Sequence, residues 1–173
     1  TGDVSGTSTV GSGYAGGVCG RNYGTIANCN NTGEVSGIYG FVYAGGVCGF
    51  NGGTIENCYN TGDVSGTSTV GSGYAGGVCG ANGNSATIIN CYNTGDVSGT
   101  SSNGTVYAGG VCGRNYYGTI QNCYNTGDVS GEATDSDGCA YVGGVCGFNG
   151  GTIENCYFLF GTADKAVSIN SGT

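Results

Sequence analysis

Apolar and β-branched residues of this chain occur in short groups separated by glycine and asparagine. The first such groups are residues 3–5, 14–19 and 25–30. Their spacing is not that of an amphipathic helix, and valine, isoleucine and tyrosine favour strands. Between two such groups, residues 49–53 read Gly-Phe-Asn-Gly-Gly, and Asn-Gly is a strong turn signal. The pattern predicts three short strands joined by turns.

This arrangement is repeated five times. The block Thr-Gly-Asp-Val-Ser-Gly, with Glu for Asp in the second copy, starts at Thr1, Thr32, Thr61, Thr94 and Thr126, so the copies begin 31, 29, 33 and 32 residues apart. A period of this size is typical of a solenoid. We expect an all-β fold, a right-handed parallel β-helix of about five coils of ~31 residues, over residues 1–160. Residues 161–173 would form a partial coil, a cap or a linker.

If each copy forms one coil, equivalent residues of neighbouring coils stack about 4.8 Å apart and form columns. The expected columns are Val18, Val47, Val78, Val111 and Val145; Tyr14, Tyr43, Tyr74, Tyr107 and Tyr141; Ile26, Ile55, Ile89, Ile120 and Ile153; and Asn28, Asn57, Asn90, Asn122 and Asn155. In this alignment the third copy is one residue shorter than the others between Ile89 and Cys91. Strand alternation puts Val18 and Cys19 on opposite faces, and the sequence does not decide which face is buried.

Ten of the eleven cysteines fall into five couples, one in each repeat. The couples are Cys19–Cys29, Cys48–Cys58, Cys79–Cys91, Cys112–Cys123 and Cys146–Cys156. Pairing along a column would strand one cysteine in each column of five, so we expect one disulfide within each coil. Each would contribute about 2.5–3 kcal/mol to a fold with a thin core. Cys139 would be unpaired or would link two chains. Disulfides indicate an oxidising compartment.

Three blocks resemble the GLUG motif of bacterial surface and secreted proteins. They are Gly-Gly-Val-Cys-Gly, Gly-Thr-Ile-x-Asn-Cys-Tyr and Asn-Thr-Gly-Asp-Val-Ser-Gly, and they fit best in residues 45–66 and 109–131. The resemblance covers nearly all of residues 1–160. It implies an extracellular β-solenoid that serves as the stalk or repeat region of a large adhesin-like protein or an immunoglobulin-A-cleaving peptidase. It implies no catalytic residue within the motif.

Charge limits the set of partners. Only 8% of the residues are charged, the net charge is −8, and Arg21, Arg114 and Lys165 are the three basic residues. This balance argues against nucleic acid and anionic membranes as partners. No stretch has the roughly 18 apolar residues of a membrane span. The sequence begins on a repeat rather than on Met, so we expect a piece of a longer chain.

The sequence offers little catalytic chemistry. It has no histidine, so neither a Ser-His-Asp nor a Cys-His site can form within it. Its acidic column, Asp3, Glu34, Asp63, Asp96 and Asp128, has a spacing near that of a retaining glycosidase, but every column of a solenoid shares that spacing. Asp135 and Asp137, in the acidic loop at residues 132–138, are weak calcium candidates. We expect no cofactor and no dedicated metal site.

Tyrosine occurs 13 times. Its rows fit either a strip that binds sugars or proteins, or a stacked ladder that stabilises neighbouring coils, and we favour the ladder. The sequence therefore predicts a non-catalytic, extracellular or cell-surface structural and adhesive segment, a stalk or fibre. Its partners would be neighbouring domains of a larger chain, or host or matrix glycans and proteins. The alternatives are a filament subunit that stacks end to end with copies of itself, and a β-helix polysaccharide-degrading enzyme.

Overall fold

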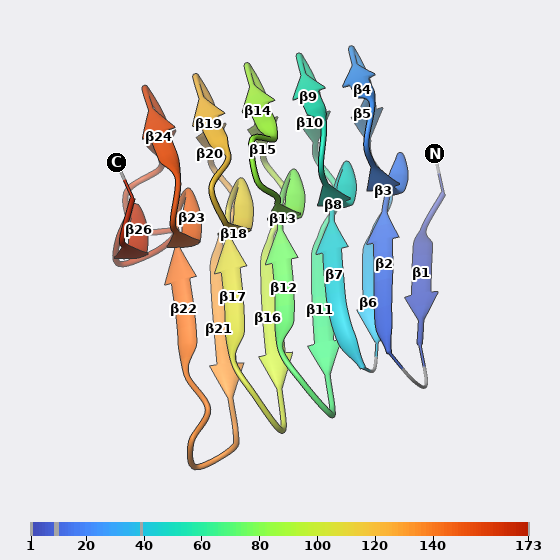
Figure 1. Ribbon diagram of the computed structural model, residues 1–173, viewed down its shortest axis with the longest axis vertical. Coiled ribbons are helices and arrows are strands. Elements are labelled where there is room, and N and C mark those ends of the chain that lie inside the picture. The colour runs from blue at the N-terminus through green and yellow to red at the C-terminus, as the bar shows by residue number, and fades with distance from the viewer. Residues whose placement is uncertain (1, 9–10, 39, 173) are drawn as a thin grey trace.

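The structure is a computed structural model that describes residues 2–8, 11–38 and 40–172. These residues form 26 strands and no helix, so the described part holds no helix that could cross a membrane. The strands belong to five sheets, and each pairing given between strands is parallel and joins one repeat to the next. The chain thus winds as a parallel β-solenoid of five coils (Figure 1).

Each coil contributes one strand to each sheet, in the same order. Sheet A contains β1 (Val4–Thr7), β6 (Val35–Ile38), β11 (Val64–Ser68), β16 (Val97–Ser101) and β21 (Val129–Ala133). Sheet B contains β2 (Ser12–Gly16), β7 (Phe41–Gly45), β12 (Gly73–Gly76), β17 (Val106–Gly109) and β22 (Ala140–Gly143). Sheet C contains β3 (Cys19–Asn22), β8 (Cys48–Asn51), β13 (Cys79–Asn82), β18 (Cys112–Asn115), β23 (Cys146–Asn149) and β26 (Val167–Asn170).

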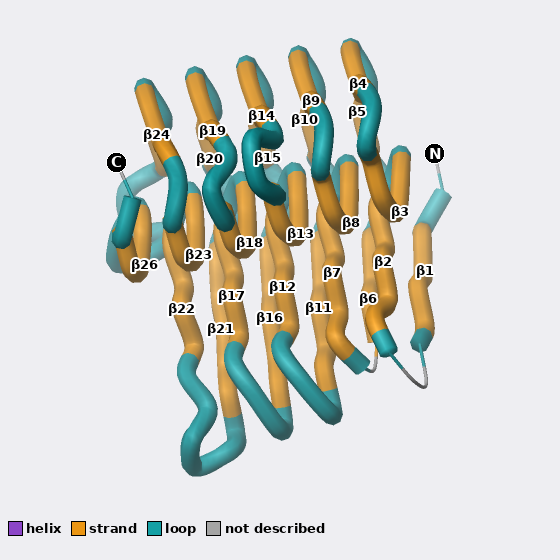
Figure 2. The backbone as a smooth tube through the Cα atoms, in the orientation of Figure 1, coloured by secondary structure: helices purple, strands orange, loops and turns teal. Residues whose placement is uncertain are grey.

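The two remaining sheets consist of shorter strands. Sheet D contains β4 (Thr25–Ala27), β9 (Thr54–Glu56), β14 (Thr87–Ile89), β19 (Thr119–Gln121) and β24 (Thr152–Glu154). Sheet E contains β5 (Asn30–Asn31), β10 (Tyr59–Asn60), β15 (Tyr92–Asn93), β20 (Tyr124–Asn125) and β25 (Tyr157–Phe158). Figure 2 shows how loops join the strands of one coil and how the coils lie side by side.

Each coil has five strands rather than the three that the hydrophobic pattern predicts, because two of the expected strands are bent in the middle. The first bend follows sheet B, at Gly46 in the second coil, where an added Cβ would lie 2.2 Å from the Gly77 carbonyl oxygen. The second separates sheets D and E at Asn57, whose φ is 53°. Asparagine tolerates this left-handed conformation better than other non-glycine residues. Equivalent asparagines make the same bend in the other coils.

The first bend also settles which face is buried. Because the chain turns at Gly46, alternation stops there, and both Val47 and Cys48 are 0% exposed. The prediction that valine and cysteine lie on opposite faces is therefore wrong. Val47 precedes sheet C and Cys48 begins it, and both belong to one buried cluster with Ile55 and Cys58.

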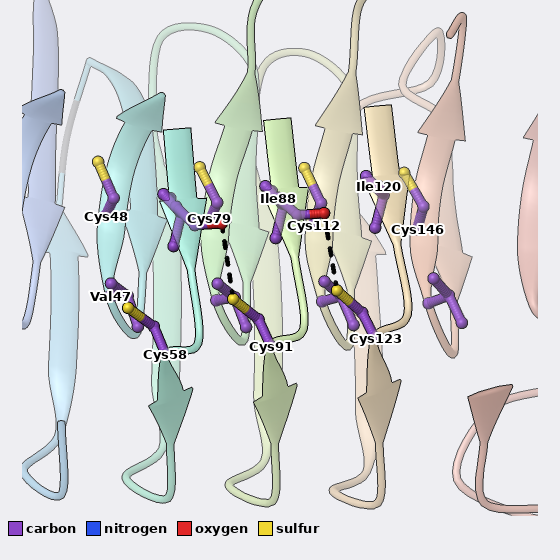
Figure 3. Packing of buried hydrophobic residues seen from close by; sticks show 14 of the residues in the cluster. Val47, Cys48, Cys58, Cys79, Ile88, Cys91, Cys112, Ile120, Cys123 and Cys146 are labelled. Carbon is purple, nitrogen blue, oxygen red and sulfur yellow. Dashed lines mark hydrogen bonds between the residues drawn. The ribbon is translucent and has the colours of Figure 1, made fainter. Parts of the chain in front are cut away.

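Two apolar clusters fill the coil. One is made of the isoleucine and two cysteines that each coil supplies between sheets C, D and E, with the valine of the second to fifth coils (Figure 3). The other is made of valines and alanines of sheets A and B, such as Val35, Val42 and Ala44. In the third coil the buried isoleucine is Ile88, which pairs with Ile55 and Ile120, whereas Ile89 pairs with Glu56 and Gln121. The third copy is therefore not shortened between its isoleucine and Cys91, and Ile88 takes the place of Ile89 in the predicted isoleucine column.

Two columns of asparagine lie inside the rod among these apolar groups. On sheet C, the Asn51 side-chain amide donates to the Asn82 side-chain oxygen (2.9 Å), and Asn82 donates in turn to Asn115 (3.0 Å). The column comprises Asn22, Asn51, Asn82, Asn115, Asn149 and Asn170. A parallel column on sheet E comprises Asn31, Asn60, Asn93 and Asn125. The second N–H of Asn82 reaches the carbonyl of Ala86 (3.1 Å), so burial leaves its amide satisfied.

The segment after residue 160 lies against the fifth coil. Val129 of sheet A donates to the Thr162 carbonyl (2.9 Å), Gly144 donates to that of Lys165 (2.7 Å), and β26 pairs with β23. The segment passes from sheet A to sheet C without adding a strand to sheet B. Residues 161–164 and Val142 line a shallow cavity of about 350 Å³ where that strand would lie.

No disulfide is present. All eleven cysteines lie in the described ranges and all are free thiols, so the expected bridge within each coil is not supported. The two cysteines of one coil belong to different columns. Figure 3 shows Cys48 and Cys58 in two separate rows of cysteines, one that continues to Cys79 and one that continues to Cys91. The Cys48 thiol donates to the Phe50 carbonyl (3.1 Å) and the Cys58 thiol to that of Glu56 (3.1 Å). Seven of the thiols are buried and fill space as small apolar side chains.

Removing one amide from the inner asparagine column should destabilise the fold. We expect Asn82→Ala to lower the free energy of unfolding by about 2 kcal/mol or more, because Asn51 and Asn115 lose a buried partner. Asn84→Ala, in the exposed turn nearby, is the control and should change it by less than about 0.5 kcal/mol. Urea denaturation of the two variants and the wild type measures both values. Equal stability of the variants would show that the inner column contributes nothing.

The thiols should be free and mostly unreactive. Burial raises the pKa of the Cys79 thiol well above its usual range, and the thiolate is the reactive form. We expect exposed Cys139 to react first with a thiol reagent in the native protein, and eleven thiols to be counted after unfolding without reductant. A count near one, obtained by mass spectrometry after alkylation, would instead support the predicted disulfides within the coils.

Candidate functional site: the aromatic and arginine face

The outer surface of sheet B carries one tyrosine per coil. Alternation along the strand turns Ala44 inward, where it is 0% exposed, and turns Tyr43 outward. In-register pairing then stacks the rings. The ring centroids are 4.8 Å apart for Tyr14 and Tyr43, 4.5 Å for Tyr43 and Tyr74, and 5.0 Å for Tyr74 and Tyr107. This tyrosine column confirms the ladder that the sequence predicts. The ring faces are therefore largely covered by neighbouring rings.

A second column borders the tyrosines on the outer surface of sheet C. Its members pair in register and are Arg21, Phe50, Ala81, Arg114 and Phe148. Phe50 meets Tyr43 edge to face (6.1 Å between centroids), and Phe148 meets Tyr107 in the same way (6.2 Å). The two columns together form one surface, which we call the aromatic face.

Each arginine of this face is surrounded by aromatic rings. The guanidinium carbon of Arg114 lies 4.9 Å from the Tyr107 ring centre, 4.4 Å from that of Tyr116 and 5.0 Å from that of Phe148. Such distances are typical of cation–π contacts. One terminal nitrogen, Nη1, donates to the Tyr107 hydroxyl (3.3 Å). We call this group the second arginine box.

The first arginine box repeats this arrangement three coils earlier. The guanidinium carbon of Arg21 lies 4.6 Å from the Tyr14 ring centre, 5.2 Å from that of Tyr23 and 5.7 Å from that of Phe50. Arg21 also donates a hydrogen bond to the Tyr23 hydroxyl. Both boxes arise from the tripeptide Arg-Asn-Tyr, at residues 21–23 and 114–116. This repeated tripeptide is the signal in the sequence that could have revealed them.

Neither guanidinium has an acidic partner among the described residues. Both groups donate to tyrosine hydroxyls, and Nε of Arg114 is buried without any partner among the described residues. In a chain with net charge −8, two of the three basic side chains thus lie on the aromatic face without a carboxylate. The face combines fixed positive charge with a row of phenolic hydroxyls.

The acidic column lies elsewhere, just before the strands of sheet A. Its carboxylates accept hydrogen bonds from the backbone of the next coil. Asp3 accepts from the Glu34 N–H (3.1 Å), Asp63 from that of Asp96 (3.0 Å) and Asp96 from that of Asp128 (2.9 Å). An open groove of about 240 Å³ runs beside them, lined also by serines of sheet A. The contacts give these carboxylates a structural role.

The other predicted candidates are not brought together into a larger site. Asp135 and Asp137 lie in the loop between β21 and β22, and the described residues contain no group of three or more His, Cys, Asp or Glu side chains placed to hold a metal ion. Cys139, in the same loop, is exposed, and its proximity raises the pKa of Tyr141. A second tyrosine row on sheet E is also stacked, with Tyr59 and Tyr92 centroids 4.9 Å apart.

The tyrosine column should make stability depend on alkaline pH. Burial, and then the neighbouring Tyr74 and Tyr14, raise the pKa of Tyr43 to about 12. An unfolded tyrosine ionises near pH 10, so the unfolded chain loses this proton first. The free energy of unfolding should therefore be full below pH 10 and fall between pH 10 and about 12. Urea midpoints from pH 8 to 12 measure this fall.

Two variants isolate the contribution of Tyr43. Tyr43→Phe should flatten part of the alkaline fall, whereas Tyr117→Phe, which removes an exposed hydroxyl, should leave it unchanged. The same pH dependence in all three proteins would contradict the assignment to Tyr43.

Comparison with known proteins agrees with this geometry. Among curated proteins, none matches the sequence. The fold resembles a solved structure of a candidate immunoglobulin A1 protease from Bacteroides ovatus, with a TM-score of 0.64 and 24% sequence identity over 95% of this chain. The chain spans 60% of that protein, and at this identity the likeness shows the fold alone. The model of the GLUG motif matches residues 11–36, 42–65, 71–98, 104–130 and 138–160. These matches cover more than half of the sequence, and the chain belongs to the GLUG-motif repeat family.

Proposed function

We propose that this chain is a non-catalytic structural segment, a stalk with an adhesive face, of an extracellular or cell-surface protein. The observation that carries the proposal is the unbroken register of the five coils. Every sheet continues from one coil to the next, and the inner asparagine columns run along the same direction. A rod built in this way holds the groups attached to its two ends at a fixed separation.

The surface supports an adhesive role beside the spacing role. Exposed aromatic rings are often used for contact with sugars and proteins because they combine apolar area with a polar group. Here Tyr23, Tyr117 and Tyr157 are 67%, 72% and 69% exposed. Tyr23 and Tyr117 follow the strands β3 and β18 of sheet C, so the stalk presents exposed rings in more than one coil beside the aromatic face.

The two alternatives have less support. A filament made by end-to-end stacking requires all five sheets to continue into the next copy, but residues 161–172 already cover sheets A and C of the fifth coil and leave sheet B short. A polysaccharide-degrading enzyme would have to rely on the acidic column, whose carboxylates Asp3, Asp63 and Asp96 are bonded to backbone N–H groups. The solved structure is named a candidate immunoglobulin A1 protease, but this chain spans only 60% of that protein.

Changing the number of coils tests the spacing role. Deleting residues 61–93 removes one coil and joins Asn60 to Thr94. The new junction is again Asn-Thr, because Asn93 precedes Thr94 in the wild type. We expect the shortened chain to fold and the distance between the first and last coils to fall by about 4.8 Å. Spin-labelled unnatural amino acids are introduced at exposed Thr25 and Glu154, in the first and last coils. Double electron–electron resonance then measures the distance between the two labels.

Deleting only residues 61–76 is the matched control. It removes half a coil, puts the following strands out of register, and should unfold the chain. The stalk proposal fails if the whole-coil deletion unfolds the chain as well, or if it leaves the separation of the two labels unchanged.

A further inference from the structure

We propose that each arginine box binds the carboxylate of an acidic sugar on an otherwise neutral glycan. The inference rests on the adhesive part of the proposed function and names the ligand class. Its starting point is a pair of sites with the same residue types: Arg21 with Tyr14, Tyr23 and Phe50, and Arg114 with Tyr107, Tyr116 and Phe148.

The hydrogen-bonding capacity of the arginines points to an anion. A guanidinium has five N–H donors in a planar fork that matches a carboxylate. Arg114 uses one of them on the Tyr107 hydroxyl, and its Nε is covered by protein atoms, so the terminal nitrogens are the donors that a ligand can reach. The rings around half-buried Arg114 shield it in part from water, and a charged hydrogen bond is stronger in such surroundings. The boxes thus hold a preformed positive charge whose donors lack an acidic partner within the described chain.

The charge of the whole chain selects the kind of anion. At a net charge of −8, a polyanion such as nucleic acid or a heavily sulfated glycan is repelled as it approaches. A neutral glycan with a single carboxylate avoids most of this repulsion and still neutralises one guanidinium. The ligand that fits is therefore a sugar chain with isolated carboxylates, such as a uronic acid among neutral residues.

The tyrosine column can contact a sugar through the hydroxyl edges of its rings rather than through the ring faces. Stacking 4.5–5.0 Å apart covers the ring faces between Tyr14 and Tyr107, so a sugar cannot lie flat on these rings. The hydroxyls can each donate and accept a hydrogen bond. Sugar hydroxyls beside the bound carboxylate find such partners along the column, whereas a simple carboxylate gains only the guanidinium contact.

The two boxes lie at a fixed separation. Three coils separate Arg21 from Arg114, which corresponds to about 14 Å along the rod. Two acidic sugars on one glycan can then occupy both boxes, and the second contact forms at the high effective concentration that linkage provides. The structure therefore assigns two equivalent binding sites per chain.

Nuclear magnetic resonance titration of the 173-residue chain tests the assignment. The acidic probe is an oligosaccharide of neutral sugars that ends in one glucuronic acid. The neutral comparison is the same oligosaccharide ending in glucose. We expect shifts at both boxes with the acidic probe and binding at least ~10-fold weaker with the neutral one. A short peptide with a single carboxylate should also bind at least ~10-fold more weakly, because it lacks the sugar hydroxyls.

Charge-matched variants locate the sites. Arg21→Gln should abolish the shifts at the first box alone, Arg114→Gln those at the second, and the double variant both. Lys165→Gln makes the same change in charge in the partial sixth coil and should leave both sites intact. Because Arg21 is exposed, its variant keeps the test valid even if the Arg114 variant is less stable.

Several results would overturn the proposal: equal binding of the acidic and neutral oligosaccharides, equal binding of the peptide, or unchanged binding in a folded double variant. No binding of the acidic probe at millimolar concentration would do the same. None of these results affects the label separation measured in the coil-deleted chain, so failure of this inference and failure of the stalk proposal are distinguishable.

Discussion

The structure depends on one constraint, the exact-register stacking of each coil on the one before. Val47 donates its N–H to the Val78 carbonyl (2.9 Å), and Val78 donates in the same way to Val111 (2.9 Å). Because like residues meet at every level, a side chain that stacks well on itself is favoured at every position. Tyrosine stacks through its ring and asparagine through its amide, and both form columns here.

The same constraint explains why polar residues can lie inside a thin core. Burial of a lone amide destabilises the fold when its donors and acceptor have no hydrogen-bond partner. In a column, the oxygen of Asn82 accepts from Asn51 and its nitrogen donates to Asn115, so each level satisfies the next. The column also holds the register, because a shift by one residue would leave the amides without partners. Buried cysteines fill the remaining space without bridges.

Much of this could be predicted from the sequence. The repeats fix the parallel solenoid and its five coils, and the tyrosine and valine columns follow from equivalent positions. The bends at Gly46 and Asn57 could not be read from hydrophobic pattern, because they depend on a close approach of backbone from the next coil and on a left-handed residue. The expected disulfides came from counting cysteines, and counting does not show that Cys48 and Cys58 lie in different columns. The tripeptide Arg-Asn-Tyr marks the arginine boxes, but Phe50 and Phe148 reach them from the next coil, and no single repeat reveals that contact.

The register also links the fold to its proposed role. A stalk needs constant geometry over its length, and an adhesive face needs its groups at regular positions; in-register stacking supplies both. The most direct test of this register is the measurement of scalar couplings across hydrogen bonds by nuclear magnetic resonance. The account predicts a coupling from the Val47 amide nitrogen to the Val78 carbonyl carbon, and from Val78 to Val111. Couplings from these amides to carbonyls of their own repeat would contradict it.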